Sequence, residues 1–179
     1  DKLAATALFA AVATDTGWFR FGSTRPRTYE VAARLLRDGA EPAAIYRDLY
    51  EQDTLGRMRL RGRVLGRIET DLGGRLAWTH ILASDFAETG AVPSDTEDLV
   101  NLLLAIRGTA AAVIFVEQQT GGFKLSFRSR CELDCSEVSG VFGGGGHRAA
   151  AGAFLKGTLD EVRTSALHAV RQRMRATRD

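Results

Sequence analysis

The stretch Phe142-Gly143-Gly144-Gly145-Gly146-His147-Arg148-Ala149-Ala150-Ala151-Gly152 carries the strongest local signal in this 179-residue sequence. Glycines have no side chains to obstruct approach, so the backbone N–H groups of this run can close on a phosphate or on the face of a base. His147 and Arg148 would supply polar contacts at the end of the loop. A flexible glycine linker is the alternative, but small residues suited to close packing follow the run at once. We therefore predict a phosphate- or nucleotide-binding loop.

A β-hairpin is predicted upstream of this loop. Ala111 to Glu117 is an apolar run rich in strand formers, Gly121-Gly122 has turn chemistry, and residues 123 to 128 alternate strictly between apolar and polar. Because the side-chain period of a strand is two, Lys124, Ser126 and Arg128 face the same way. They can contact phosphate together, although a solvated polar face explains the pattern equally well.

Further elements alternate between strand and helix patterns. Leu76 to Leu82 and the segment around Ala153 to Lys156 predict strands. Ser94-Asp95-Thr96-Glu97 has the form of a capping box and predicts a helix that ends at Gly108, and Thr158 with Glu161 predicts the start of a final helix. This alternation indicates an α/β or α+β domain.

The N-terminal third of the sequence predicts helices joined by turns. Residues 3 to 13 predict a buried helix that leads into a turn at 14 to 17, Thr28 can cap a helix closed by Gly39, and Pro42 opens another. Residues 54 to 68 predict a helix with an apolar stripe of Leu55, Met58, Leu65 and Ile68. Five arginines fall mainly on its other faces, so it is read as a solvated connecting helix or as a nucleic-acid-facing one.

The composition limits the class of protein to which this chain can belong. With 45% hydrophobic and 26% charged residues the chain is an ordinary globular protein, and a net charge of +2 does not by itself indicate a polyanion partner. All but three of the 24 basic residues are arginine, which suits bidentate phosphate contacts but is also a common consequence of genome composition. Cys131 and Cys135 alone cannot form a disulfide framework or a four-ligand zinc site. No apolar run approaches the length of a membrane span, so we expect a reducing, cytoplasmic setting without a membrane partner. The chain opens on Asp1 inside a helical pattern, which we interpret as a segment cut from something longer.

Asp15 is the candidate metal ligand. Its carboxylate emerges from the predicted buried helix into a glycine turn, where it is well placed to ligate a hard metal ion. A turn or helix-cap aspartate is the alternative interpretation.

Taken together, these motifs resemble one family. FGGGGHRAAAG, preceded by KLSFRS and by Asp134-Cys135-Ser136-Glu137-Val138, resembles the C-terminal substrate-binding domain of DHH-family phosphoesterases. TDTGWFRFGSTRPRTYEVAARLL resembles the last motif of that family's catalytic domain. The similarity is greatest to the branch that degrades short oligonucleotides, the oligoribonuclease and 3′-phosphoadenosine 5′-phosphate phosphatase or nano-RNase enzymes.

The resemblance implies an α/β fold with two parts. Residues 1–52 would be the C-terminal part of a DHH catalytic domain, residues 53–74 a connecting helix and linker, and residues 75–179 a complete small DHH-associated α/β domain with a mixed sheet.

The resemblance also implies a site. In the family, two Mn²⁺ ions held by Asp and His clamp a water and the scissile phosphate. Asp15 matches the final metal-ligand aspartate, and Arg128 with Ser129 matches an Arg-Ser pair that contacts substrate phosphate. The remaining matches lie in the nucleotide-receiving loop, and they are Gly144, Gly145, Gly146 and His147, with Gly143 and Arg148 completing the predicted substrate-binding set.

The sequence departs from the family pattern because it contains no D-H-H triplet, and its three histidines are isolated. One ligand cannot assemble a two-metal centre. We therefore expect a segment that binds nucleotides but is inactive alone, from a phosphoesterase acting on short RNA oligonucleotides, adenosine 3′,5′-bisphosphate, or both. Homodimer formation is a further expectation from the family.

Three alternatives stay open at this point. One is a phosphodiesterase for cyclic or linear dinucleotides. Another is a non-catalytic RNA-binding module like that of alanyl-tRNA synthetases, which the Arg-rich helix from 57 to 67 would fit. The third is a single-strand-specific DNA exonuclease.

Overall fold

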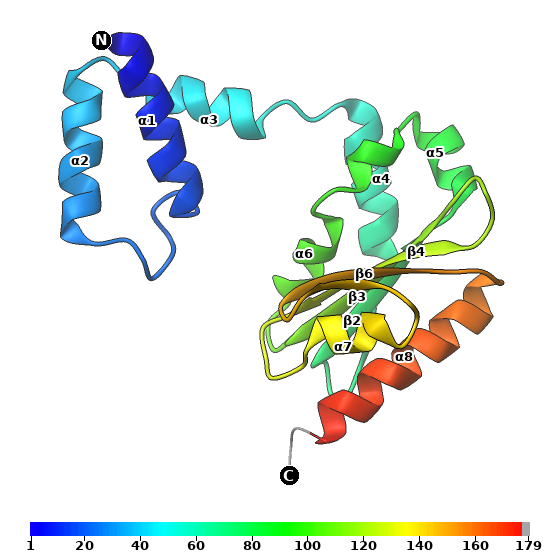
Figure 1. Ribbon diagram of the computed structural model, residues 1–179. Coiled ribbons are helices and arrows are strands. Elements are labelled where there is room, and N and C mark those ends of the chain that lie inside the picture. The colour runs from blue at the N-terminus through cyan, green and yellow to red at the C-terminus, as the bar shows by residue number, and fades with distance from the viewer. Residues whose placement is uncertain (177–179) are drawn as a thin grey trace. The chain divides into compact units, whose positions relative to one another are not determined.

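The computed structural model describes residues 1–176 and divides the chain into two compact units, Asp1–Asp53 and Thr54–Asp179 (Figure 1). The first unit is built from helices and the second from helices around a sheet. The fold is therefore the expected mixed α/β one. Every helix in the described part of the chain is too short or too polar to cross a lipid bilayer.

The first unit contains helices α1 (Lys2–Asp15), α2 (Pro26–Arg37) and α3 (Pro42–Tyr50). The core of this unit consists of seven buried hydrophobic residues, Ala5, Phe9, Ala13, Ala32, Leu35, Ala40 and Ile45. Pro42 opens α3 as predicted, because a first-turn proline sacrifices no helical hydrogen bond.

Two helix boundaries differ from the prediction. Thr14 and Asp15 are the last residues of α1 and not part of a turn, and the Thr14 hydroxyl donates to the carbonyl of Ala10 at 2.8 Å. Helix α2 begins at Pro26, so that Thr28 lies inside its first turn, where its hydroxyl accepts from the N–H of Arg25 at 3.1 Å. In both places the threonine lies inside the helix and its hydroxyl bonds to nearby backbone, so neither threonine marks the helix boundary.

The second unit is organised around a six-stranded mixed sheet in the order β1-β2-β3-β4-β6-β5. The strands are β1 (Glu69–Asp71), β2 (Leu76–Ile81), β3 (Ala111–Glu117), β4 (Phe123–Ser129), β5 (Gly145–His147) and β6 (Ala150–Leu155). Only β2 and β3 pair in parallel, and the other neighbours are antiparallel. The predicted strands and the β3–β4 hairpin are confirmed, whereas the sequence did not indicate β1 and β5.

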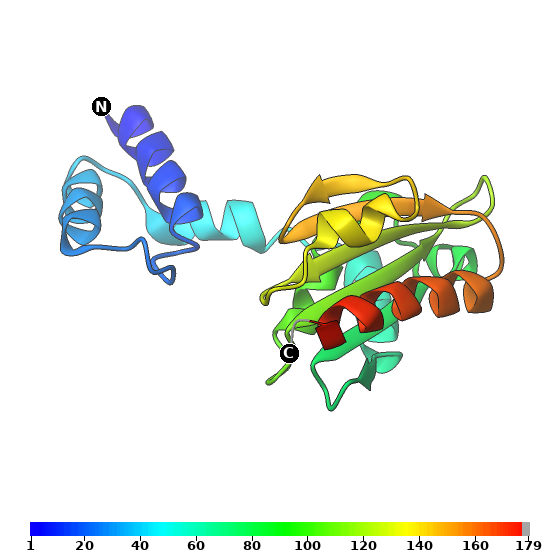
Figure 2. The same ribbon diagram turned by 60° about the horizontal axis from the view of Figure 1, so that its bottom comes forward.

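Helices cover both faces of this sheet (Figure 2). Helices α7 (Cys135–Gly140) and α8 (Leu159–Ala176) pack on one face, over a core that includes Phe115, Leu125 and Phe127. Helix α6 (Leu99–Leu104) packs with α4 (Leu55–Gly66) on the other face, against β2 and β3. The predicted capping box of α8 forms, since Thr158 N–H donates to the Glu161 carboxylate at 2.8 Å.

Helix α4 belongs to the second unit and is not a solvated connector as the sequence suggested. Leu60 and Val64 are fully buried, whereas Leu55, Met58 and Leu65 of the predicted apolar stripe are exposed. The buried residues are four apart, so they lie on one side of the helix. On the same side, a Cβ at Gly56 would lie 2.7 Å from the carbonyl oxygen of Gly90, so close packing against α5 (Ala83–Thr89) selected this face.

The predicted helix from 94 to 108 is interrupted. Residues Pro93–Thr96 form a short 3₁₀ turn, η1, and α6 starts only at Leu99. The carboxylate of Asp95 accepts from the N–H of Val92 at 2.9 Å, so the capping bond forms at the start of η1, two residues before the predicted Ser94. Asp98 then has a left-handed backbone with φ of 63°, which a continuous helix does not tolerate.

Candidate nucleotide-binding site

The polar face of β4 lies where the alternation placed it. Phe123, Leu125 and Phe127 are buried in the core under α8, while the intervening side chains point to the opposite side. The β4–β6 register continues that side, because it pairs Lys124 with Phe154, Ser126 with Gly152, and Arg128 with Ala150. Residues directly opposite each other in a ladder share a face.

Strand β5 adds the glycine-rich loop to the same face. His147 pairs with Ala150 and Gly145 pairs with Gly152, so Arg128, Ala150 and His147 form one row across three adjacent strands. The Cα atoms of Arg128 and His147 are therefore two strand spacings apart, roughly 10 Å, with only a methyl group between the two side chains. We call this side of the three strands the β4–β6–β5 face.

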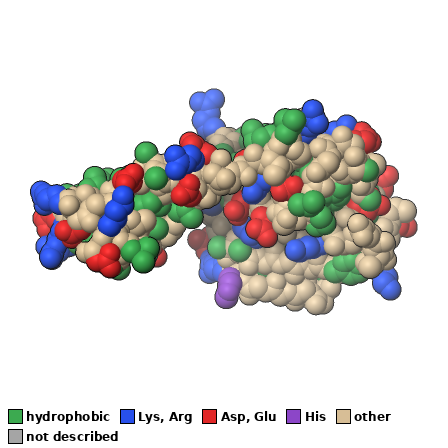
Figure 3. All heavy atoms as spheres, turned by 90° about the horizontal axis from the view of Figure 1, so that it is seen from above, with side chains coloured by type: hydrophobic (Ala, Val, Ile, Leu, Met, Phe, Trp, Pro, Cys, Tyr) green, Lys and Arg blue, Asp and Glu red, His purple; other side chains and the backbone are tan. Residues whose placement is uncertain are grey.

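The β4–β6–β5 face is open to solvent in the described part of the second unit. On β6 the buried residues Ala151 and Ala153 point to the α7 side, while Gly152 and Phe154 on the other side are accessible, and β5 is exposed throughout. Figure 3 shows that the surface of the second unit includes a broad area of backbone and uncharged side chains with a histidine at its border.

Two of the four loop glycines have a steric reason within the fold. A Cβ at Gly144 would lie 2.7 Å from the Cβ of Ala153 and closer still to the carbonyl oxygen of Gly152. Gly146 has φ of 146°, and a Cβ there would meet the Cα of Ala151 at 2.5 Å. Here the loop runs against β6, and side chains would prevent the β5–β6 pairing.

The other two glycines differ from this. Gly143 has φ of 71°, so its conformation alone favours glycine where α7 runs into β5. Gly145 does not have a left-handed φ, and a Cβ there would meet nothing within 4 Å. The fold of residues 1–176 therefore gives no reason for glycine at 145. An incoming ligand that touches the backbone would supply one.

Arg128 is the cation in the row that contains His147. Its Nη1 donates to its neighbour's carbonyl, Phe127 O, at 3.0 Å, and the side chain is half-buried. Within residues 1–176 no carboxylate pairs with it, so its charge is available to an anion. Arginine binds phosphate through two parallel N–H donors.

Ser129 does not share this face, although the sequence predicted that it acts with Arg128. Adjacent residues of a strand point to opposite sides, and Ser129 is buried with its hydroxyl accepting from Cys131 N–H at 3.2 Å and bonded to Cys131 O at 3.2 Å. Its side chain therefore fixes the bend after β4.

Arg148, also predicted to bind substrate, already has a carboxylate partner in the structure. Its guanidinium forms an ion pair with the carboxylate of Glu132, and its carbonyl accepts from the N–H of Cys135 at 2.8 Å.

Burial raises the pKa of the Cys135 thiol to about 11, so the thiol stays protonated at neutral pH and is no nucleophile.

Asp15 lies in the first unit, exposed at the last residue of α1. No group of three or more His, Cys, Asp or Glu side chains in residues 1–176 is arranged to hold a metal ion. The donors that the structure describes therefore do not fit a two-metal centre by themselves.

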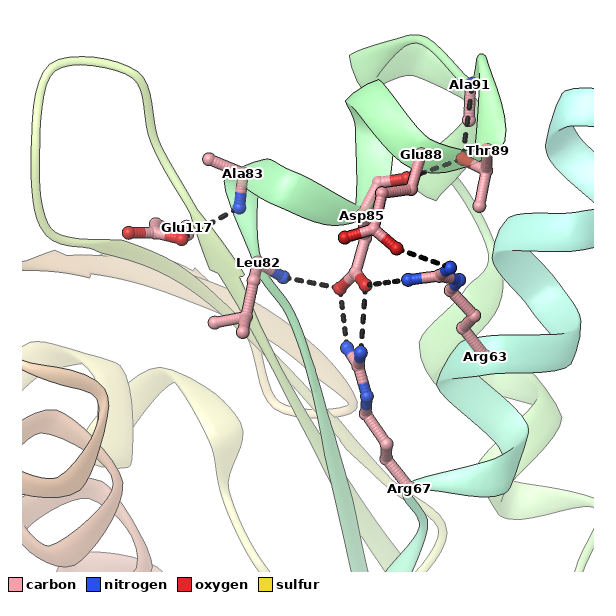
Figure 4. Close-up of polar contacts among 9 residues, drawn as sticks. All are labelled: Arg63, Arg67, Leu82, Ala83, Asp85, Glu88, Thr89, Ala91 and Glu117. Carbon is pink, nitrogen blue, oxygen red and sulfur yellow. Dashed lines mark hydrogen bonds and ion pairs between the residues drawn. The ribbon is translucent and has the colours of Figure 1, made fainter.

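Reasoning from the sequence missed a buried carboxylate that ties α4 to α5 (Figure 4). Asp85 is fully buried and accepts two bonds from the Arg67 guanidinium, at 2.5 and 2.8 Å, one from Arg63 at 3.3 Å and one from Leu82 N–H at 2.8 Å. Burial by itself raises the pKa of Asp85, but the bonds from Arg67 and Leu82 outweigh it and hold the pKa below its usual value. Arg63 also pairs with Glu88 at 2.6 Å.

These ion pairs bear on the arginine-rich helix. Arg63 and Arg67 are held by Asp85 and Glu88, so their charges are neutralised inside the second unit. This favours a structural role for α4 over a nucleic-acid-facing one.

The second unit is thus a small α/β domain, a mixed sheet with helices on both faces and with the glycine-rich strand β5 at one edge. Residues 79–176 match the family model described as the DHHA1 domain. The chain belongs to the DHHA1 domain family, as the resemblance to DHH-family phosphoesterases predicted.

Curated relatives extend the match beyond that domain. The chain is 35% identical over 171 residues to the bifunctional oligoribonuclease and PAP phosphatase NrnA of Thermus thermophilus, covering 95% of this chain and 51% of that protein. It is 29% identical over 152 residues to the protein of the same name from Bacillus subtilis, covering 85% of this chain and 47% of the relative. The chain thus spans about half the length of these relatives.

A solved structure agrees over the whole chain. The crystal structure of an exopolyphosphatase-related protein from Bacteroides fragilis superimposes with a TM-score of 0.89 at 26% identity. It covers 100% of this chain and 53% of that one. Both units therefore have counterparts in a longer protein.

Proposed function

We propose that this chain is the nucleotide-binding segment of a phosphoesterase that hydrolyses short RNA oligonucleotides and adenosine 3′,5′-bisphosphate. The observation that carries the proposal is the row formed by Arg128, Ala150 and His147, which places an unpaired guanidinium and an exposed imidazole on one open face. The names of the relatives support the choice of substrate.

The chemistry of this face suits a phosphate. Arg128 would bind it with paired N–H donors, and His147 would contact it from the neighbouring edge. Strand β5 ends the sheet order, so the backbone groups on its outer side are available for a ligand. Gly145 lets that ligand approach the backbone without meeting a side chain.

Hydrolysis requires more than these residues provide. When bound, a Mn²⁺ pair would polarise the phosphate and activate a water. Asp15 would be one ligand, but within residues 1–176 it belongs to no group of three or more His, Cys, Asp or Glu side chains that could hold a metal ion. We therefore propose that the 179-residue chain binds its ligands without cleaving them. Mn²⁺ dependence, homodimer formation and a cytoplasmic location stay predictions.

Isothermal titration calorimetry of the full chain tests this proposal. Adenosine 3′,5′-bisphosphate and the RNA trinucleotide ApApA are titrated into the wild type and into Arg128→Gln. We expect Arg128→Gln to weaken both ligands by about tenfold or more, since a charge-assisted bond contributes about 1.5–3 kcal/mol. Arg59→Gln is the matched control, because Arg59 is exposed on α4 and its loss changes the net charge equally.

Three results would contradict the proposal. If neither ligand binds the wild type, the proposal has no basis. If Arg128→Gln and Arg59→Gln lose the same affinity, the loss reflects net charge and not a contact at Arg128. Release of mononucleotides from ApApA by the purified chain with Mn²⁺ would show that the segment is catalytically complete.

A further inference from the structure

A hollow of about 620 Å³ continues the β4–β6–β5 face away from Arg128, toward the turn between β3 and β4. Its lining combines glycines and small or apolar residues with three polar side chains and one aromatic ring. The lining residues are Gln118, Thr120, Lys124, Leu125, Gly144, Gly152, Ala153 and Phe154.

Phe154 is the unusual member of this lining. It is 44% exposed, although its β6 neighbours on the core side, Ala151 and Ala153, are buried. Its ring lies near the hairpin turn, where a Cβ on Gly122 would be 3.1 Å from the ring tip. An exposed ring at the edge of a hollow offers a π-face to a flat ligand.

Lys124 stands directly opposite Phe154 in the ladder. Its ammonium group makes no ion pair within residues 1–176, and the nearby Glu117 carboxylate accepts from the N–H of Ala83 at 2.7 Å. Figure 4 shows this Glu117 contact at the start of α5. The pair Lys124–Phe154 thus joins an unpaired cation to an exposed aromatic ring.

The pair lies at a fixed distance from the predicted phosphate row. Lys124 and Arg128 are four residues apart on one strand, which separates their Cα atoms by about 13 Å. Ser126 and Gly152, with Gly145 beside them on β5, lie between the two rows, so only small groups separate them. This side of the strands therefore has a cation at each end, with only small groups between the two cations.

We propose that Lys124 and Phe154 form a subsite for a second nucleotide of a short single-stranded RNA, with Phe154 stacking its base and Lys124 contacting its phosphate. This inference rests on the proposed function, because it takes the first nucleotide to be held at Arg128 and His147. Stacking on an aromatic ring is tolerant of base identity, so the subsite selects for chain length and not for sequence.

The test compares a ligand of one nucleotide with a ligand of three. Adenosine 3′,5′-bisphosphate and ApApA are titrated by calorimetry into the wild type, Phe154→Ala, Phe154→Leu and Lys124→Gln. We expect Phe154→Ala to weaken ApApA by about tenfold and to change bisphosphate affinity by less than twofold. Phe154→Leu keeps an apolar side chain without the ring and should lose almost as much, and Lys124→Gln should follow the same ligand dependence.

The outcomes separate this inference from the proposed function. If both ligands bind the wild type and Phe154→Ala leaves both affinities unchanged, the subsite is wrong while the proposed function stands. If Phe154→Ala weakens the bisphosphate as much as ApApA, the ring contacts the first nucleotide and the second-nucleotide assignment is wrong. If neither ligand binds the wild type, both proposals fail. Urea unfolding midpoints of all variants, expected to equal that of the wild type, show that the affinity losses are local.

Discussion

Substituting two neighbouring glycines by alanine should have opposite effects on the second unit. In Gly144→Ala the new Cβ would meet Ala153 Cβ at 2.7 Å and the carbonyl oxygen of Gly152 closer still. These atoms belong to a paired strand and its backbone, so relief requires β6 to move. We expect a loss of about 2–3 kcal/mol, at the upper end of the range for overpacking.

Gly145→Ala should have no such penalty. Its Cβ would meet nothing within 4 Å and its φ is not left-handed, so the alanine fits without strain. Restricting the unfolded chain should then stabilise the protein by about 0.4–1 kcal/mol. The same methyl group would project where the ligand is proposed to approach, so we expect ApApA affinity to fall while stability rises.

Urea unfolding followed by tryptophan fluorescence measures the difference between these variants. Trp18→Phe in every protein leaves Trp78, buried in the core of the second unit, as the only tryptophan reporter. Gly144→Ala unfolding within 0.5 kcal/mol of the wild type would refute the steric argument. A Gly145→Ala variant destabilised by more than 1 kcal/mol would show that a structural demand at this position has been overlooked.

Three further predictions concern residues around the site. Asp85→Asn removes the buried charge that pairs with two arginines and should destabilise the second unit by about 2–4 kcal/mol. Glu88→Gln breaks only a partly exposed pair and should cost about 0.5 kcal/mol. Equal losses of unfolding free energy in urea would contradict the burial of Asp85. Burial and the charge of Arg67 lower the pKa of His80. As the pH falls through about 6.5, His80 takes up a proton in the unfolded chain more readily than in the folded chain. Lowering the pH therefore favours unfolding. The urea unfolding midpoint should be lower at pH 5.5 than at pH 7.5, and His80→Gln should reduce this difference. A variant with the same pH dependence as the wild type would contradict the role of His80. Ser129→Ala should cost about 1 kcal/mol through the lost bonds to Cys131 and leave ApApA affinity intact, and a tenfold affinity loss would return Ser129 to the binding face.

Local sequence signals predicted those elements whose determinants are themselves local. The β3–β4 hairpin followed from apolar alternation around Gly121-Gly122, and α8 from its capping box. Helix α4 was located but its buried face was wrong. Leu55, Met58 and Leu65 are exposed, because packing against α5, β2 and β3 buries the side of the helix that carries Leu60 and Val64. The helix predicted to start at Ser94 was also wrong, because the capping bond joins Asp95 to Val92 at a short 3₁₀ turn and the left-handed Asp98 separates that turn from α6.

The sequence by itself determined which residue types this protein could use for binding, and its resemblance to a known family identified the motif that carries them. It also determined that Lys124, Ser126 and Arg128 share one side of a strand, since the side-chain period is fixed by backbone geometry. Only the tertiary structure decided that His147 joins Arg128 in one row and that the Ser129 hydroxyl bonds to the backbone of Cys131. It also decided that Gly145, unlike the other three loop glycines, has no conformational or steric need to be glycine. Register between strands far apart in sequence depends on the packing of the whole sheet, and no local pattern encodes it.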